Sequence, residues 1–272
     1  MGLLAGQRRR RLVHDLRSHM RLLLRADPGR DQMVELARLF DPDARPAGAG
    51  RICVDVQRQL YLTRPSTVDP GTAAEAQAPP GLPVAYFVQV QGRSAPTDIS
   101  GLQREKRKLQ ESGILLLNGL AIRLGGFAWP PPKAASDPLQ ATVYTPRPVT
   151  AADVLGLIGQ YIYGLVPRED AWMASMEAES WQTPDGRLQA ELWPGRATLA
   201  MMDPPAALGE MRFRSGQLYT TVLRLADPAN RTDPDAARAV GRAALAVAAA
   251  TGGTCVDLLG FRVLQPDDLV MR

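Results

Sequence analysis

Apolar residues recur with helical spacing near the start of the chain. Between residues 8 and 25 they occupy one face of a helix with 3.6 residues per turn: Leu12, Val13, Leu16, Met20, Leu23 and Leu24. Asp27-Pro28 interrupts this pattern, and a second apolar face follows over residues 33–40. Because proline suits the first turn of a helix and Asp41-Pro42 ends one, the pattern predicts a helical hairpin over residues 1–41. Residues 42–50, rich in Pro, Gly and Ala, are expected to form a linker.

A first α+β unit is predicted over residues 51–183. Short apolar stretches at 52–57, 59–63 and 84–90 have the length and composition of strands. The stretch between the last two, residues 64–83, contains five prolines separated by small and polar residues. Loops of this length are uncommon in compact domains, so we expect a long mobile loop there.

The order strand, helix, Gly-Gly, strand occurs twice along the chain. The first occurrence comprises a strand over 84–90, a helix over 98–123, Gly125-Gly126 and an extended 127–129. The second comprises a strand over 218–225, a helix over 233–250, Gly252-Gly253 and an extended 254–257. A glycine just after a helix commonly takes the left-handed conformation that ends it. We therefore expect the chain to turn back along a sheet at both glycine pairs.

Between the two occurrences the pattern predicts a strand over 140–145, a helix over 150–163 and a strand over 171–183. Taken from residue 84, the predicted order is then β-α-β-β-α-β, the split βαβ or ferredoxin-like arrangement. The sequence therefore predicts an α+β protein with a ferredoxin-like unit, duplicated in whole or in part. Residues 184–272 are expected to form the second α+β unit.

Positive charge is concentrated in the first 30 residues, which contain eight arginines and two aspartates. Their net charge of +6 exceeds the +4 of the whole chain, so residues 31–272 carry about −2. A localised charge of one sign selects partners of the opposite sign. The candidate residues for binding an anionic partner are Arg8, Arg9, Arg10, Arg11, Arg17, Arg21 and Arg25.

A second basic cluster lies in the predicted helix over 98–123. It consists of Arg104, Lys106, Arg107 and Lys108, and is partly neutralised by nearby glutamates. Such a cluster is most often a solvated helix face. The alternative is that it joins the N-terminal arginines in one electropositive surface.

The sequence contains no motif for nucleophilic or metal chemistry. Both histidines, His14 and His19, lie in the basic segment, which argues against a histidine-based triad and a His-rich zinc site. Cys53 and Cys255 are too few for a disulfide scaffold, and we expect buried thiols. A disulfide between them stays open, because their segments fit neighbouring strands. The glycine pairs follow helices, whereas phosphate-binding glycines precede them, so no cofactor is expected.

Three glutamates form the best carboxylate group. Glu177 and Glu179 alternate onto one face of the predicted strand over 171–183, and Glu191 lies on the next strand. Carboxylates so placed can bind a divalent cation or act as acid and base. The favoured interpretation is the solvated face of an antiparallel sheet, where such alternation is usual.

We expect a cytoplasmic protein. No apolar stretch has the form of a signal peptide, and the longest apolar runs are near eight residues, whereas a membrane span needs about twenty. The basic amphipathic helix suggests a non-enzymatic binding or adaptor protein that docks on an anionic partner or in a protein groove. A protein partner is favoured, with nucleic acid, an anionic membrane surface and homo-oligomerisation also open.

Two alternatives remain. One is non-specific nucleic-acid binding through the arginines. The other is an enzyme of unknown reaction using the face of Glu177, Glu179 and Glu191. The apolar stripe of the first helix is also suited to packing on the protein's own body, since most helices gain their stability from such packing.

Overall fold

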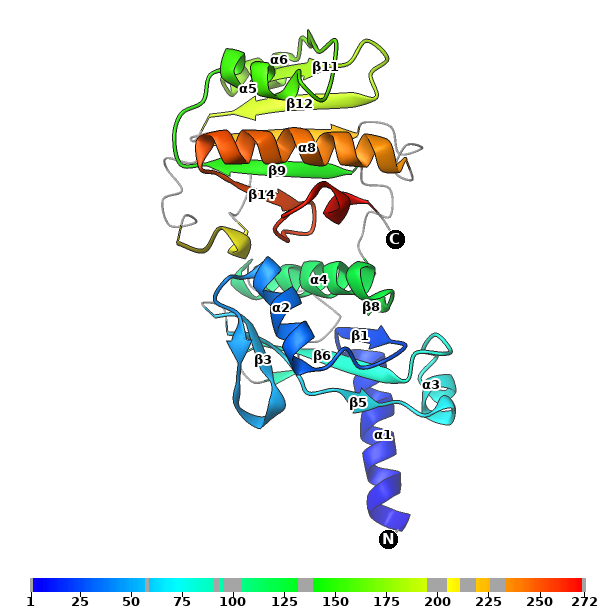
Figure 1. The fold of residues 1–272 in the computed structure, drawn as a ribbon. Helices are drawn as coiled ribbons and strands as arrows, with labels where there is room; N and C mark the ends of the chain where they lie inside the picture. Colours follow the sequence, from blue (N-terminus) through cyan, green and yellow to red (C-terminus); the bar gives the residue numbers. More distant parts are fainter. Residues whose placement is uncertain are drawn as a thin grey trace. The chain divides into compact units, whose positions relative to one another are not determined.

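The computed structural model describes residues 2–56, 59–90, 93–94, 104–131, 139–194, 205–210, 219–225 and 233–270. The chain divides into two compact units, unit 1 (Met1–Lys133) and unit 2 (Ala134–Met271) (Figure 1). Each unit combines helices with an antiparallel sheet, so the predicted α+β class is confirmed. No helix in the described part of the chain is long and apolar enough to cross a bilayer.

Unit 1 contains a sheet with the strand order β2-β3-β4-β6-β1-β8, and β5 and β7 also pair with β6. Its elements in chain order are α1 (Gly2–Ser18), β1 (Arg21–Leu24), α2 (Arg30–Phe40), β2 (Arg45–Pro46), η1 (Gly48–Gly50), β3 (Ile52–Asp55), β4 (Leu60–Leu62), β5 (Ser66–Thr67), α3 (Pro70–Glu75), β6 (Val84–Val90), β7 (Arg93–Ser94), α4 (Arg104–Leu124) and β8 (Phe127–Trp129).

Unit 2 contains a sheet with the strand order β10-β11-β12-β13-β9-β14. Its elements are β9 (Gln140–Thr145), α5 (Ala151–Ile158), β10 (Val166–Pro167), α6 (Ala171–Ser175), β11 (Glu179–Gln182), β12 (Leu188–Trp193), β13 (Tyr219–Leu225), α8 (Pro234–Thr251), β14 (Thr254–Asp257) and η4 (Pro266–Leu269).

Both faces of the unit 1 sheet are covered. Successive side chains of a strand point to opposite faces, so Leu23 and its neighbour Leu22 on β1 are buried on different sides. Leu23 packs with Val13 and Leu16 of α1. On the other side α4 lies against β1, where a Cβ added at Gly113 would come within 2.8 Å of Met20. The sheet is therefore sandwiched between α1 and α4.

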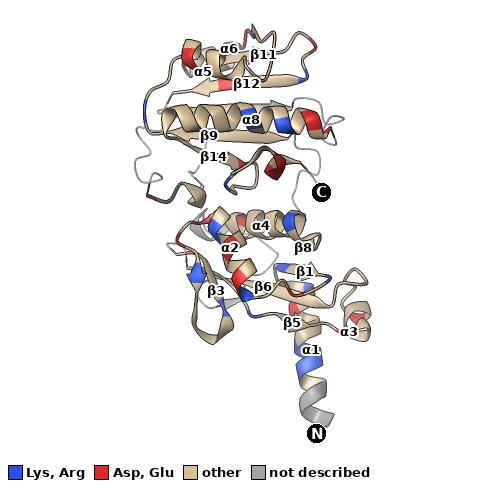
Figure 2. Ribbon diagram, viewed as in Figure 1, with Lys and Arg blue, Asp and Glu red and all other residues tan. Residues whose placement is uncertain are grey.

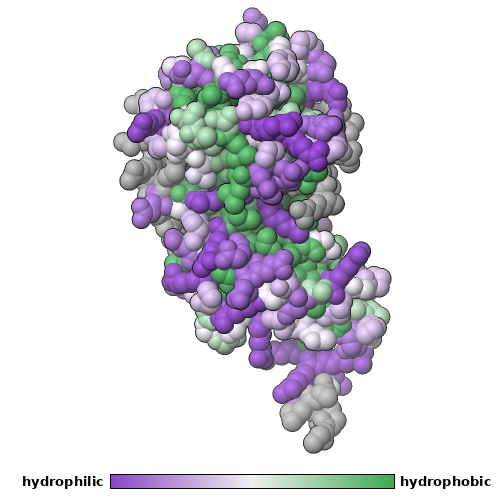
Figure 3. All heavy atoms as spheres, in the orientation of Figure 1, coloured by the Kyte–Doolittle hydropathy of each residue, from purple (hydrophilic) through white to green (hydrophobic). Residues whose placement is uncertain are grey.

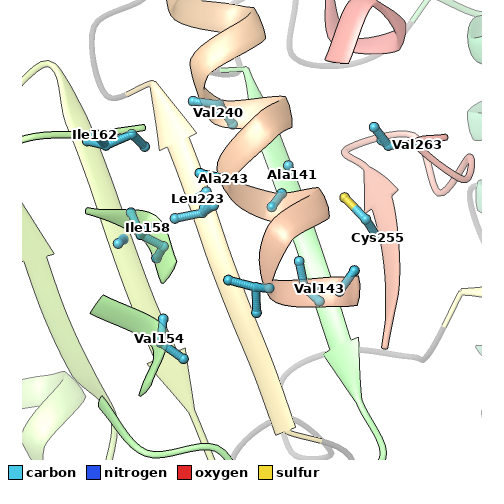
Figure 4. Packing of buried hydrophobic residues seen from close by; sticks show 14 of the residues in the cluster. Ala141, Val143, Val154, Ile158, Ile162, Leu223, Val240, Ala243, Cys255 and Val263 are labelled. Atoms are coloured by element: carbon cyan, nitrogen blue, oxygen red, sulfur yellow. The ribbon is translucent and has the colours of Figure 1, made fainter. Parts of the chain in front are cut away.

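The core of unit 2 lies between its sheet and α8 (Figure 4). Ala243 and Val240 of α8 pack against Val143 and Leu223 from β9 and β13, and Ile158 of α5 extends the cluster. Small alanines on α8 let the helix approach the sheet closely, as interiors packed to crystal-like density require. Asp233 caps α8, accepting hydrogen bonds from the backbone amides of residues 235 and 236 at 3.0 and 3.2 Å.

The two sheets have the same strand order when their elements are matched in chain order, so that β2-β3-β4-β6-β1-β8 corresponds to β10-β11-β12-β13-β9-β14. The registers agree as well. Leu23 pairs with Phe127 and Ala85 in unit 1, and Tyr144 pairs with Thr254 and Thr220 in unit 2. The correspondence can be traced from these residues through each strand pairing to the outer strand of each sheet. It ends at Pro46 on β2 and Pro167 on β10, which therefore occupy corresponding positions at the sheet edges.

Both glycine pairs end their helices as predicted. Gly125 and Gly252 are left-handed, with φ of 62° and 66°. The amides of Gly126 and Gly253 donate to carbonyls five residues earlier, at 2.8 and 2.9 Å, which is the Schellman pattern. A Cβ added at Gly126 would lie 2.5 Å from the carbonyl oxygen of Leu23, and one at Gly253 would lie 2.7 Å from that of Tyr144. Leu23 and Tyr144 are corresponding positions of β1 and β9.

The predicted N-terminal helical hairpin is wrong. The first helix ends at Ser18, and residues 21–24 form β1, which lies inside the sheet between β6 and β8. All four residues of β1 are buried. A strand buried on both faces is a continuous apolar run, and a run this short cannot be distinguished from a helical stripe by periodicity.

Three further boundaries differ from the sequence analysis. The expected linker 42–50 contains β2, which pairs with β3 inside unit 1. The expected mobile loop 64–83 contains β5 and α3, the latter capped by Asp69, which accepts from the Thr72 amide at 2.9 Å. The expected division at 183/184 falls between β11 and β12, which pair in unit 2. The prolines of 64–83 thus flank short ordered elements.

The β-α-β-β-α-β run predicted from residue 84 does not lie in one sheet. Its strands β6 and β8 belong to unit 1, whereas β9 and β11 belong to unit 2. The predicted strand over 171–183 also separates into α6 and β11. Asp170 starts α6 by accepting hydrogen bonds from two backbone amides at 3.1 Å, a capping signal that the apolar alternation concealed.

The two cysteines are free and buried, as predicted for the thiols. Cys53 lies on β3 of unit 1 and Cys255 on β14 of unit 2, so they are not on neighbouring strands and form no disulfide. Burial raises the pKa of Cys255 to about 12, and burial is also the main cause that raises the pKa of Cys53. Each unit thus contains one shielded thiol.

We expect the native chain to resist thiol reagents at a pH of about 8. The thiolate is the reactive form, and a thiol with a pKa near 12 is ionised in only about one molecule in ten thousand at that pH. The number of thiols labelled per chain, measured by absorbance, should stay near zero until denaturant is added. It should then rise to two, because both cysteines become accessible. Native labelling at the rate of a free thiol would contradict the burial of the residue that reacts.

Candidate functional site

The apolar stripe of α1 packs on the protein's own body. Val13 and Leu16 are buried against Leu23, Ala85 and Phe87 of the sheet. Leu12 and the residues of α3 complete this cluster from the side. Over residues 6–18 of α1, whose side chains the structure describes, the sheet covers the apolar face, and the polar face is the one left for a partner.

Two of the arginines predicted to bind an anionic partner instead link α1 to α3. Arg9 forms an ion pair with the Glu75 carboxylate at 3.1 Å, and Arg17 donates to the Glu75 backbone carbonyl. The pKa of Asp69, lowered mainly by hydrogen bonds from Thr72, is lowered further by Arg9. Glu75 was not singled out from the sequence because it lies in the stretch expected to be a loop. These two arginines therefore have partners within unit 1.

Arg8, Arg10 and Arg11 form the arginine face of α1. All three are exposed, and among the described residues no ion pair or hydrogen bond is found for them. At 100° per residue, Arg10 and Arg11 lie on the side of the helix opposite Leu16. The basic residues of α1 are blue in Figure 2, and hydrophilic atoms cover the described part of this helix in Figure 3. These exposed guanidinium groups surround the part of the helix that the sheet leaves uncovered.

The end of α1 is held by a histidine contact. The His19 ring nitrogen Nδ1 lies 3.3 Å from the Asp15 carboxylate, one helical turn earlier. The His14 and His19 rings meet edge to face, with centroids 5.7 Å apart. Although Asp15 and the two histidines are near one another, the described part of the chain contains no group of three or more His, Cys, Asp or Glu side chains placed to hold a metal ion. This arrangement links the end of α1 to its preceding turn.

Arg21 does not belong to the arginine face, although the sequence predicted it to. It lies on β1, is only 5% exposed, and its guanidinium stacks on the Trp129 ring at 5.4 Å from the ring centroid. It also donates to the His19 carbonyl oxygen at 3.5 Å. Burial lowers its pKa to about 10. The strand, rather than a helix, directs this side chain into the face that α1 covers.

The other basic candidates also lie apart from the arginine face. Arg25 is exposed but follows β1, outside α1. Arg104, Lys106 and Arg107 are on α4, and their side chains lie outside the described residues, while Lys108 is half-buried. α4 and α1 cover opposite faces of the sheet, so the helix that carries the second cluster lies apart from α1.

The three glutamates do not form a carboxylate site. Register pairs Glu191 with Ser180, so Glu191 and Glu179 point to opposite faces of the sheet. Glu191 is buried and accepts a hydrogen bond from Trp193 Nε1 at 3.0 Å, whereas Glu177 is exposed in the turn after α6 with φ of 56°. The predicted strand that would have aligned Glu177 with Glu179 is instead a helix followed by a turn. The carboxylate site on which the enzyme interpretation relied is therefore not formed.

The described residues hold no group of three or more His, Cys, Asp or Glu side chains placed to bind a metal ion. Comparisons with protein-family models, curated protein sequences and solved structures find no match to this chain. The arginine face of α1 is therefore the one predicted binding feature that the described structure keeps together.

Proposed function

We propose that this chain is a non-enzymatic binding protein that docks an acidic protein surface on the arginine face of α1. The observation that carries the proposal is the combination of a buried apolar stripe with the exposed Arg8, Arg10 and Arg11, which have no ion pair or hydrogen bond within the described ranges of the chain. A helix held on a sheet loses little conformational entropy on binding, which favours affinity. Guanidinium groups suit carboxylates because each offers a planar fork of donors.

An acidic protein is favoured over nucleic acid by the distribution of charge. Outside the first 30 residues the chain is slightly acidic, at about −2. A nucleic acid is a long polyanion that contacts a protein over a wide surface, whereas the rest of unit 1, residues 31–133, offers it a net charge of only +2 and unit 2 carries −5. An acidic patch of small area on a protein can be bound by the helix alone. The apolar face of α1 is occupied by the sheet, so docking in an apolar groove is not part of the proposal.

Glutamine substitutions at Arg8, Arg10 and Arg11 test the proposal. In fluorescence anisotropy with a labelled oligoglutamate peptide, we expect the full chain to bind at about 50 mM NaCl and to lose most affinity at about 500 mM. The triple variant should bind about threefold to a hundredfold more weakly, since exposed ion pairs contribute roughly 0.2–1 kcal/mol each. A single-stranded DNA of equal charge serves as the competing ligand.

The matched control is Arg242→Gln, which removes an exposed arginine from α8 in unit 2. It should leave peptide binding unchanged. Equal losses in the control and the triple variant would show that net charge, and not the arginine face, governs binding. Tighter binding of the DNA than of the peptide would replace the proposal with nucleic-acid binding.

We also propose that the two units are copies of one ferredoxin-like unit, each extended by an outer strand. The main elements β1, α2, β4, β6, α4 and β8 follow the order β-α-β-β-α-β, and β3 adds a strand beside β4. Support comes from the identical strand order, from the shared registers, and from glycine pairs that contact corresponding carbonyls. In this scheme α1 is an addition that belongs to unit 1 alone.

A further inference from the structure

The two units carry opposite net charges. Unit 1 has 20 basic and 12 acidic residues, for a net charge of +8, whereas residues 134–271 have 11 basic and 16 acidic residues, for −5. Such an asymmetry makes each chain complementary to other copies of itself, because surfaces of opposite sign steer association.

Unit 2 exposes an acidic surface made of Glu169, Glu177 and Glu179. All three are exposed on the short hairpin around α6: Glu169 precedes α6, Glu177 follows it and Glu179 begins β11. The Arg168 amide donates to the Ser180 carbonyl at 2.8 Å, so the segments that carry Glu169 and Glu179 are adjacent. The arginine of this segment, Arg168, forms an ion pair with Asp170 at 3.4 Å. Among the described residues none of the three glutamates has a cationic partner.

Large aromatic side chains are exposed within this hairpin and just before it in the chain. Trp172 of α6 is 53% exposed and meets the buried Trp193 ring edge to face at 5.5 Å, which fixes its orientation. Tyr163, just before β10, is 78% exposed. Aromatic faces attract guanidinium groups, and in unit 1 the chain already uses this contact between Arg21 and Trp129. Carboxylates beside an exposed tryptophan therefore favour an arginine-rich partner.

We propose that the arginine face of α1 in one copy docks on the acidic surface of unit 2 in a second copy. The inference rests on the proposed function and names the partner of the same face. Three exposed guanidinium groups meet three exposed carboxylates, and Trp172 offers a ring for stacking. Because both surfaces are present in every chain, the contact can form twice in a closed dimer or repeat along an open chain.

Analytical ultracentrifugation of the full chain tests this pairing through reversed charges. One variant carries Arg8→Glu, Arg10→Glu and Arg11→Glu, and the other carries Glu169→Arg, Glu177→Arg and Glu179→Arg. We expect the parent chain to associate at about 50 mM NaCl and to dissociate at about 500 mM. Each variant alone should associate at least about tenfold more weakly. An equimolar mixture of the two should regain association, since the reversed surfaces match each other.

Two outcomes would overturn the inference. One is a parent chain that stays monomeric at every concentration and salt level. The other is a mixture that associates no better than either variant alone. Both are separable from failure of the proposed function: if the parent chain is monomeric but still binds oligoglutamate through the arginine face, the binding function stands and only the identity of the partner is wrong.

Discussion

A chain that begins at residue 26 will not fold its first unit, whereas one that begins at residue 12 will. The longer deletion removes β1, which pairs with β6 on one side and β8 on the other. It also removes Leu22, Leu23 and Leu24, all nearly or fully buried, and burial of each contributes about 1.5–3 kcal/mol. Together the three leucines account for about 4.5–9 kcal/mol, which is comparable to the total stability of about 5–15 kcal/mol of most domains, and the strand pairing on both sides of β1 is lost in addition. The shorter deletion removes α1 up to Arg11, with the ion pair between Arg9 and Glu75, and leaves Val13, Leu16 and β1 in place.

Thiol labelling at low denaturant measures this difference. In the chain from residue 26, Cys53 should react at once while Cys255 stays protected, because each unit has its own core. In the chain from residue 12 both should stay protected. Protection of Cys53 in the longer deletion would show that unit 1 does not depend on β1. Binding experiments that remove the basic segment should therefore stop before Leu12.

Replacing the second glycine of either pair with alanine will destabilise its unit by about 3 kcal/mol or more. At Gly126 the new Cβ would lie 2.5 Å from both the Leu23 carbonyl oxygen and a methyl carbon of Leu24. At Gly253 it would lie 2.7 Å from the Tyr144 carbonyl oxygen. Backbone atoms of a central strand cannot move aside without breaking its pairing, so the clash persists as strain.

The first glycine of each pair is the matched control. Gly125 and Gly252 have no atom within 4 Å of an added Cβ, so alanine there costs only the left-handed backbone conformation, about 1 kcal/mol. Urea unfolding followed by circular dichroism should rank Gly126→Ala as more destabilising than Gly125→Ala, with the same order in unit 2. Equal costs within a pair would mean that the approach of β8 or β14 to its neighbour is looser than the structure shows.

Local signals in the sequence predicted the parts of the fold that depend on one residue type. The strand over 140–145 and both helix ends at glycine pairs were predicted to within a residue or so, because left-handed glycines and β-branched runs act through nearby atoms. The capping box at Thr150, where Asp153 returns the hydrogen bond, likewise starts α5 where the sequence suggested.

The parts of the fold that the sequence did not predict depend on contacts between segments that are distant in the chain. Residues 20–24 fit a helix in isolation, and only pairing with β6 and β8 makes residues 21–24 a strand. The same strand pairing buries Arg21, which the helical prediction had placed in solvent. For the candidate site, clustering of arginines was sufficient to find α1, but the contact between Arg9 and Glu75 was not visible before α3 was placed.

The prolines at the outer strands decide how the sheets meet other chains. β2 and β10 are two residues long and each ends in a proline at the same register position. A proline has no amide hydrogen to donate to an added strand, and a short outer strand offers few carbonyls. Fibril-like growth by strand addition is therefore blocked at this end of both sheets, even when copies are crowded together.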